Sequence, residues 1–305
     1  MSVNRRDLLR GAAATAVAST LPARMFAQTT VAQSGDVHLQ TLSDGTLSLP
    51  RSFITGAMPA EAEEILTRYG VTGDALTPDC NVTLLQSGDR TVLFDVGSGT
   101  EFMPTAGKLA DALAAAGVDP YDVTDVIFTH AHPDHLWGSF DDFGDMWFPN
   151  ATHHIGRAEW DYWTDPNTVS TIGAERQTFA VGAANRLGEL SDQISLFDDG
   201  AEIVPGVAAR ATYGHTPGHM SFETRVGNQS VMIVGDAIGN HHVGFERPEW
   251  ASGSDQDADL GASTRLKLLD QLNTDQMLLV GYHLPNGGIG YAEKRGNGYQ
   301  FVSAS

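Results

Sequence analysis

The sequence predicts an α+β fold in which two β-rich halves pack sheet against sheet beneath helices. Three observations predict it. Strand and helix patterns occur twice in succession, no low-complexity linker or charge block separates them, and 305 residues with a 41% hydrophobic composition can bury a large core. We therefore expect one domain over residues 28–305, preceded by a segment of different composition over residues 1–27.

The first half of this domain predicts a hairpin, a helix and a buried strand. In NVTLLQSGDRTVLFDVGSG, apolar and polar residues alternate on both sides of Ser87-Gly88-Asp89, which is typical of two antiparallel strands. The segment GKLADALAAAGVDP has Leu109 and Leu113 on one face and ends near Gly117, which predicts a helix. A short apolar strand over 125–129 then leads directly into a cluster of histidines.

The second half repeats this pattern. Strands are expected on both sides of the histidine-rich turn in ARATYGHTPGHMSFETRV, and SVMIVGDAIG predicts a strand that ends at Asp236. After a polar loop rich in Gly and Asp, residues 264–272 predict a helix, and MLLVGYH predicts a last buried strand that ends at His283. In both halves, strands deliver polar side chains at their ends, where loops can gather them around a site.

The first 27 residues predict an export signal. Arg5 and Arg6 precede a mild apolar run over residues 11–21, and small residues follow up to a cleavage site near Ala27. The run is too short to span a membrane. The paired arginines resemble a twin-arginine (Tat) signal, with a disordered basic N-terminus as the alternative. We therefore expect a periplasmic or secreted protein without stable membrane anchoring.

The charge balance excludes one class of partner. The formal charge is -20 for the whole chain and -23 without residues 1–27, since that segment carries four arginines and one aspartate. A surface this acidic repels phosphate backbones, so we expect no nucleic-acid partner. The single cysteine, Cys80, excludes an intramolecular disulfide and is expected to be a small buried hydrophobe.

The stretch THAHPDHLWG, residues 129–138, has three histidines and an aspartate within six positions. Because the chain has only 11 histidines, chance would produce this pattern in roughly one of a thousand chains of this size. Other histidines and an aspartate stand at the ends of the later strands. The polar residues collected in this way are His130, His132, Asp134, His135, His215, Asp236 and His283.

This mixture of imidazole and carboxylate ligands predicts two metal ions. Such ligands suit Zn, Mn, Fe or Co, and the lack of thiolate argues against a closed structural zinc site. Seven ligands are too many for one tetrahedral ion, but they fit two ions that share a carboxylate and keep room for water. A hydroxide held between two such ions is a nucleophile near neutral pH, and the ions polarise the group that it attacks. The pattern predicts a hydrolase with Asp134 and Asp236 as its catalytic carboxylates.

The motifs THAHPDH, GHTPGH, the Gly-Asp at Asp236 and the late His283 resemble, in this order, the metallo-β-lactamase superfamily. The resemblance covers nearly the whole chain after residue 27. It implies an αββα four-layer sandwich with two divalent ions at one edge, zinc first and Mn, Fe or Co as alternatives.

The resemblance also implies a role for each ligand. Asp236 would bridge the two ions. Asp95, in LFDVG, and His219, the second histidine of GHTPGH, would support the ligands without binding metal. The first ion would be held by His130, His132 and His215, and the second by Asp134, His135 and His283.

Within the superfamily, the ending HLPNGGIGYAEKRGNGYQFVSAS resembles the branch of methyl parathion hydrolase and related lactonases. This resemblance implies a small ester-like substrate, which would be a lactone, an aryl ester or a phosphotriester. Asn286 and Gly287 stand where methyl parathion hydrolase has an aromatic residue and a proline, so the turn is more polar here. An aspartate at position 236 disfavours a true β-lactamase.

Several points stay open at this stage. A non-catalytic, metal-dependent periplasmic binding protein is one alternative, and a thioesterase or β-lactamase-type hydrolase is another. Dimers are common among the relatives, which leaves a homodimer open. Aromatic and histidine residues near the metal motifs are candidates for the substrate pocket, although Trp and Phe clusters are more often core. The candidates are Trp137, Phe140, Phe143, Trp147, His241, His242 and Trp250.

Overall fold

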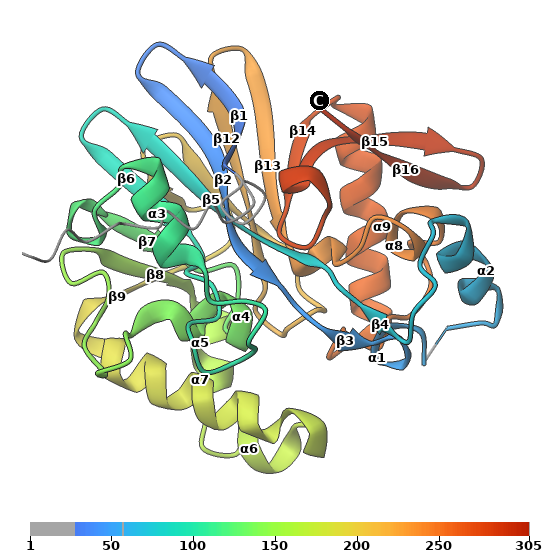
Figure 1. The fold of residues 1–305 in the computed structure, drawn as a ribbon, viewed down its shortest axis with the longest axis horizontal. Helices are drawn as coiled ribbons and strands as arrows, with labels where there is room; N and C mark the ends of the chain where they lie inside the picture. The colour runs from blue at the N-terminus through green and yellow to red at the C-terminus, as the bar shows by residue number, and fades with distance from the viewer. Residues whose placement is uncertain (1–27, 57, 305) are drawn as a thin grey trace, which may run out of the picture.

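Two seven-stranded sheets pack face to face, and helices cover the outer face of each sheet (Figure 1). The structure is a computed structural model that describes residues 28–56 and 58–304. The expected αββα four-layer sandwich is thereby confirmed. The export signal expected over residues 1–27 lies outside the described residues.

The first sheet holds the first half of the chain, and its strands lie side by side in sequence order. Strands up to β6 pair antiparallel, whereas β6 to β9 pair parallel because helices and loops carry the chain back between them. The strands are β1 (Gln28–Ser34), β2 (Val37–Thr46), β5 (Asp79–Ser87), β6 (Arg90–Phe94), β7 (Asp125–Ile127), β8 (Thr152–Gly156) and β9 (Ile194–Phe197).

The second sheet holds the second half, also in sequence order. All of its neighbouring strands are antiparallel except β13 and β14, which are parallel because a long helix connects them. The strands are β10 (Glu202–Val204), β11 (Val207–Ala211), β12 (Met220–Val226), β13 (Gln229–Gly235), β14 (Leu278–Gly281), β15 (Ile289–Arg295) and β16 (Gly298–Ser303).

The helices form the two outer layers and the rim around the end of the sandwich (Figure 1). A short pair of strands, β3 (Leu49–Pro50) and β4 (Ala75–Leu76), lies at the same rim. The helices are α1 (Arg51–Thr55), α2 (Glu61–Arg68), α3 (Leu109–Ala116), α4 (Pro133–Leu136), α5 (Arg157–Thr164), α6 (Thr168–Thr171), α7 (Gln177–Leu190), α8 (Val243–Glu246) and α9 (Ala258–Thr274).

Apolar cores separate the four layers because successive side chains of a strand point to opposite faces of the sheet. In β5, Leu84 packs into the core beneath the helices with Leu113 of α3, whereas the next residue, Leu85, packs between the sheets with Phe222. A third core lies between the second sheet and α9, around Leu269. The sheets therefore form a rigid frame from whose edge the loops extend.

Two expected elements have different bounds in the structure. Helix α9 begins at Ala258, ahead of the expected start at Thr264, because the side chain of Asp257 accepts a hydrogen bond from the N–H of Leu260 and caps the helix in a segment that resembles a loop. Strand β7 ends at Ile127, and the N–H of Thr129 bonds to a side chain instead of a neighbouring strand. Within the described residues, no helix is long and apolar enough to cross a membrane.

Candidate dinuclear metal centre

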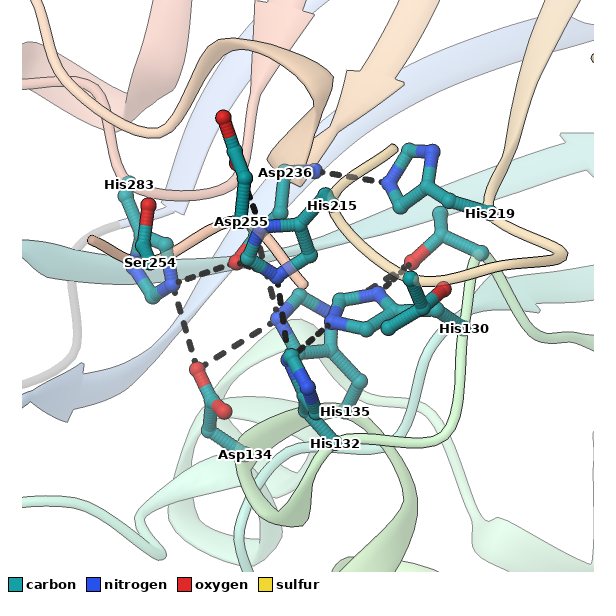
Figure 2. Close-up of polar contacts among 12 residues, drawn as sticks. His130, His132, Asp134, His135, His215, His219, Asp236, Ser254, Asp255 and His283 are labelled. Atoms are coloured by element: carbon teal, nitrogen blue, oxygen red, sulfur yellow. Dashed lines mark hydrogen bonds and ion pairs between the residues drawn. The ribbon is translucent and has the colours of Figure 1, made fainter. Parts of the chain in front are cut away.

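The seven expected ligands lie together at one end of the sandwich, where strands of both sheets stop (Figure 2). Strand β7 leads into THAHPDH and α4, β11 and β12 flank GHTPGH, and β13 and β14 end just before the last two ligands. Because the chain leaves both sheets at this edge, its loops bring together side chains from distant parts of the sequence. The residues that converge are His130, His132, Asp134, His135, His215, Asp236 and His283.

Three histidines form the first group of ligand atoms. His132 Nδ1 lies 3.0 Å from His130 Nε2 and 3.0 Å from His215 Nε2. Burial, followed by the neighbouring histidines, lowers the pKa of His130 and His132 well below the usual range, so both rings are neutral. Their nitrogen lone pairs therefore point at one another across a space that suits a cation.

Two histidines and two carboxylates form the second group. His135 Nε2 lies 3.4 Å from Asp134 Oδ2 and 3.4 Å from Asp236 Oδ1, and His283 Nε2 lies 3.2 Å from both carboxylates. Burial alone would lower the pKa of these histidines, but the two carboxylates raise it well above the usual range. The group therefore attracts positive charge, which either protons or a metal ion can supply.

Asp236 lies between the two groups. Its Oδ1 faces His135. Its Oδ2 lies 3.4 Å from His215 Nε2 of the first group and 3.2 Å from His283 Nε2 of the second group. A carboxylate in this position can bind an ion with each oxygen. The geometry agrees with the bridging role that the sequence resemblance implies.

Orphaned polar atoms test whether metal ions fit this site. Asp134 Oδ2, His135 Nε2 and Asp236 Oδ1 are all buried, and none of them makes a hydrogen bond with the described residues. Buried polar atoms are nearly always satisfied, and these three belong to residue types that bind zinc and similar ions. The donor set therefore fits two divalent cations, with His130, His132 and His215 around one and Asp134, His135 and His283 around the other.

Asp95 supports the second group from behind. Its Oδ2 lies 2.8 Å from His135 Nδ1 and accepts a hydrogen bond from Thr129 Oγ1, and its Oδ1 accepts from the N–H of Thr129. This carboxylate fixes the orientation of the His135 ring and leaves Nε2 free to face the ions. It holds THAHPDH against the end of β6 as well.

His219 lies outside the ligand groups. Its Nε2 accepts a hydrogen bond from the N–H of Asp236, and its Nδ1 lies 2.8 Å from Thr212 Oγ1. Both ring nitrogens are thus occupied by the protein, so the residue can orient the bridging aspartate but offers no lone pair to a metal.

Asp255 is a supporting residue that sequence analysis missed. Its Oδ1 lies 3.2 Å from His215 Nδ1, and its Oδ2 accepts a hydrogen bond from Arg265 Nη1 of α9. These contacts hold His215 in the tautomer whose Nε2 faces the first ligand group. Only the acidic composition of the loop around this residue pointed to such a role.

Glu159 is the second supporting residue that the sequence did not reveal. It is fully buried in α5 and accepts four hydrogen bonds. Its Oε1 binds the N–H of Ala131 and the indole N–H of Trp163, and its Oε2 binds the hydroxyl of Thr216 and the N–H of Gly218. One carboxylate therefore joins THAHPDH to GHTPGH.

Cys80 is buried, as expected, but it does not lie in a purely apolar setting. Its Sγ lies within 4.8 Å of ligand atoms of Asp134 and His283. Burial raises the pKa of the thiol to about 12, so it is protonated at neutral pH. In this state it is a weak hydrogen-bond partner for the second ligand group.

A cavity of about 300 Å³ opens directly onto the ligands. Apart from the ligands themselves, apolar side chains form most of its wall. They come from β3, α1, α7 and the loops between elements: Leu47, Leu49, Phe53, Ile54, Pro78, Phe102, Met103 and Phe179.

The aromatic residues after THAHPDH do not line this cavity, which corrects the sequence interpretation. Phe143 is 90% exposed at a loop tip, while Phe140 and Trp147 line a separate cavity. Trp137 packs behind Phe102, with ring centroids 5.6 Å apart, while α7 and the loop before it line the cavity beside the candidate ligands.

Trp250, His241 and His242 also lie outside the cavity that opens onto the ligands. Trp250 packs against the core around α1 and α2. The two histidines line a neighbouring cavity of about 380 Å³. This cavity shares Ile54, Pro78, Gly239 and His283 of its wall with the first cavity. They are therefore close to the metal centre without facing the same space.

The arrangement defines a class of protein. The family model of the Metallo-beta-lactamase superfamily matches residues 77–283, which span all seven ligands, so the chain belongs to this superfamily.

Curated relatives include proteins named N-acyl homoserine lactonase. The AttM protein of Agrobacterium fabrum is 32% identical over 127 residues, which are 41% of this chain and 44% of that protein. The AttM protein of Azorhizobium caulinodans is 30% identical over 128 residues, 39% of this chain and 43% of that protein. The matched stretch thus spans less than half of the length of these relatives.

Solved structures resemble the chain over nearly its whole length. AidC, a dizinc quorum-quenching lactonase in complex with a product, is 24% identical with a TM-score of 0.85, covering 92% of this chain and 98% of that chain. AbOPH, a hydrolase in the beta lactamase superfamily, is 29% identical with a TM-score of 0.83, covering 92% and 97%. These likenesses confirm the fold.

Proposed function

We propose that this chain is a dinuclear metal-dependent hydrolase that opens the ring of N-acyl homoserine lactones. The observation that carries the proposal is the apolar cavity that opens onto the candidate metal centre, where five of the seven candidate ligands line its wall: His132, Asp134, His215, Asp236 and His283. Hydrolysis of a lactone ring needs a polar, metal-binding centre, and the acyl chain of the substrate needs an apolar wall. The candidate metal centre and the apolar wall adjoin in this cavity. The names of the curated relatives support the same substrate class.

The chemistry follows from the residues around the centre. Two bound ions would supply a nucleophile near neutral pH and polarise the carbonyl of the substrate. Asp236 would hold both ions at a fixed spacing, while Asp255 and Asp95 keep His215 and His135 in the tautomers that face the ions. Phe53, Phe102 and their apolar neighbours exclude water from the side on which the acyl chain lies.

Apolar burial predicts how turnover depends on the acyl chain. Burying each additional methylene contributes about 0.8 kcal/mol, or about fourfold in kcat/KM, as long as the cavity has room. We expect kcat/KM to rise from N-butanoyl to N-hexanoyl homoserine lactone and then to level off when the wall around Leu47 and Phe179 is filled.

The experiment combines metal content with a substrate panel. The zinc-loaded protein is assayed on N-acyl homoserine lactones, p-nitrophenyl acetate, methyl parathion, a thioester and a cephalosporin. We expect about two ions per chain, from the donor set, with fastest turnover of the lactones. Preferred hydrolysis of methyl parathion would point to a phosphotriesterase, and two bound ions without turnover of any substrate would point to a metal-dependent binding protein.

We also propose export through the twin-arginine route. The support is Arg5 and Arg6 before the mild apolar run. Replacement of both by lysine is expected to keep the protein in the cytoplasm, as followed by cell fractionation. Recovery of the double variant from the periplasm at the wild-type level would refute this route.

A further inference from the structure

Arg176 places a charged group in the wall of the otherwise apolar cavity. It lies just before α7 and is only 8% exposed. Its guanidinium carbon lies 6.0 Å from the centre of the Phe53 ring, and Phe179, one turn further along α7, lies against the ring of His132. Arg176 therefore lines the same cavity as Phe53 of the apolar wall and His132 of the first ligand group.

The protein pairs only some of the N–H donors of Arg176. Its Nη2 donates to the carbonyl oxygens of Gly253, at 2.8 Å, and Ser254, at 3.1 Å. Within the described part of the chain, neither Nη1 nor Nε has a hydrogen-bond acceptor. An arginine carries five N–H groups, and a nearly buried one is stabilised when an acceptor meets the remaining donors.

Among the described residues that line the cavity, no other side chain offers a comparable donor. Apart from the metal ligands, the polar residues that line it are Arg176 and Ser254. The hydroxyl of Ser254 already pairs with the hydroxyl of Ser252, at 2.8 Å. A substrate held here against apolar walls therefore meets one fixed hydrogen-bond donor beside the metal centre.

We infer that Arg176 is a specificity-determining residue that donates a hydrogen bond to the amide carbonyl oxygen of an N-acyl lactone. This inference rests on the proposed function. The amide group of such a substrate stands between the ring, which must reach the metals, and the chain, which must reach the apolar wall. Arg176 lies at the corresponding boundary of the cavity and selects acylamino lactones over plain alkyl lactones.

A structural role is the competing explanation, because Arg176 also fixes the loop that carries Asp255. That role would affect every substrate equally and would weaken metal binding, since Asp255 orients His215. A substrate contact would instead affect only substrates that carry the amide. The two explanations are therefore separated by the choice of substrate.

The test measures kcat/KM of the zinc-loaded full chain for two matched lactones. One is N-hexanoyl-L-homoserine lactone, and the other is α-heptyl-γ-butyrolactone, which has the same ring and a chain of equal length but no amide. The variants are Arg176→Met, which keeps the length without donors, and Arg176→Lys, which keeps the charge. Arg186→Met is the matched control, because Arg186 of α7 stacks on Trp137 and pairs with Glu101 outside the cavity.

We expect Arg176→Met to lower kcat/KM for the acylamino lactone about 10- to 100-fold and for the alkyl lactone less than about threefold, with metal content unchanged. Arg176→Lys should lie in between, and Arg186→Met should match the wild type on both substrates. An equal loss on the two lactones, or no loss on either, would overturn the inference while leaving the lactonase proposal intact. If the wild-type protein opens neither lactone, the proposed function fails, and the inference fails with it.

Discussion

Replacing Glu159 by glutamine tests whether one buried carboxylate holds the two metal-binding loops together. The amide keeps a single acceptor oxygen, which in its better orientation stays on Ala131 and Trp163. Its NH₂ group then faces the hydroxyl of Thr216, which can rotate to accept, and the N–H of Gly218, which cannot. One hydrogen bond to a charged acceptor is lost, and an N–H is left buried without a partner.

Such a loss costs about 1.5–3 kcal/mol. The bonds from Ala131 and Trp163 also weaken because their acceptor becomes a neutral oxygen. Together these effects should destabilise Glu159→Gln by about 2–4 kcal/mol. At 2–4 °C per kcal/mol for a chain of this size, Tm should fall by about 5–15 °C. Because both loops carry metal ligands, zinc affinity should also fall about 10- to 100-fold.

The assay is urea unfolding of the metal-free protein, together with zinc titration against a competing chelator. Glu189→Gln is the control, because Glu189 is exposed on α7 and should leave both quantities unchanged. If Glu159→Gln unfolds at the wild-type urea concentration and binds zinc with wild-type affinity, the proposed joining of the two loops by Glu159 is wrong.

Three further predictions concern the bridge, acid stability and packing. Asp236→Ala should bind fewer than two ions per chain by elemental analysis and lose turnover; full activity would contradict the assignment. Burial lowers the pKa of His153 to about 4, below the ordinary value of about 6.5 for histidine, so the unfolded state takes up the proton first. His153 should therefore contribute about 3 kcal/mol to the loss of stability as the pH falls from 6.5 to 4, and His153→Phe should reduce the loss by about this amount in urea titrations at both pH values. Gly182→Ala would place a Cβ 2.4 Å from the Trp137 ring and should cost about 1–3 kcal/mol by thermal unfolding.

The fold and the convergence of the seven candidate ligands could be predicted from the sequence because their signals are local. The period-2 pattern around Ser87-Gly88-Asp89 defines two strands of the first sheet, and THAHPDH is too dense in ligands to arise by chance. THAHPDH, Asp236 and His283 also follow apolar runs, which indicates where a strand ends beside the site.

The supporting residues could not be predicted, because nothing near them in the sequence marks their role. Glu159 lies in an ordinary amphipathic helix, and only the packing of α5 against both loops makes it a fourfold acceptor. The cavity was misjudged for a similar reason. The aromatic cluster after Asp134 is close to the metals in sequence, but the wall is built by Phe53, Phe102 and Phe179 from distant segments.

The hydroxyl of Tyr282 donates a hydrogen bond to the backbone carbonyl of Asp134, a residue 148 positions earlier, and the amide of Asn81 binds carbonyl oxygens on both sides of His283. During synthesis at about 5–20 residues per second, THAHPDH therefore leaves the ribosome roughly 7–30 s before its last partner exists. In that interval the chain holds an incomplete set of ligands. The residues that would hold the second ion are complete only after His283 has been made, so binding of that ion would follow the docking of the closing strands.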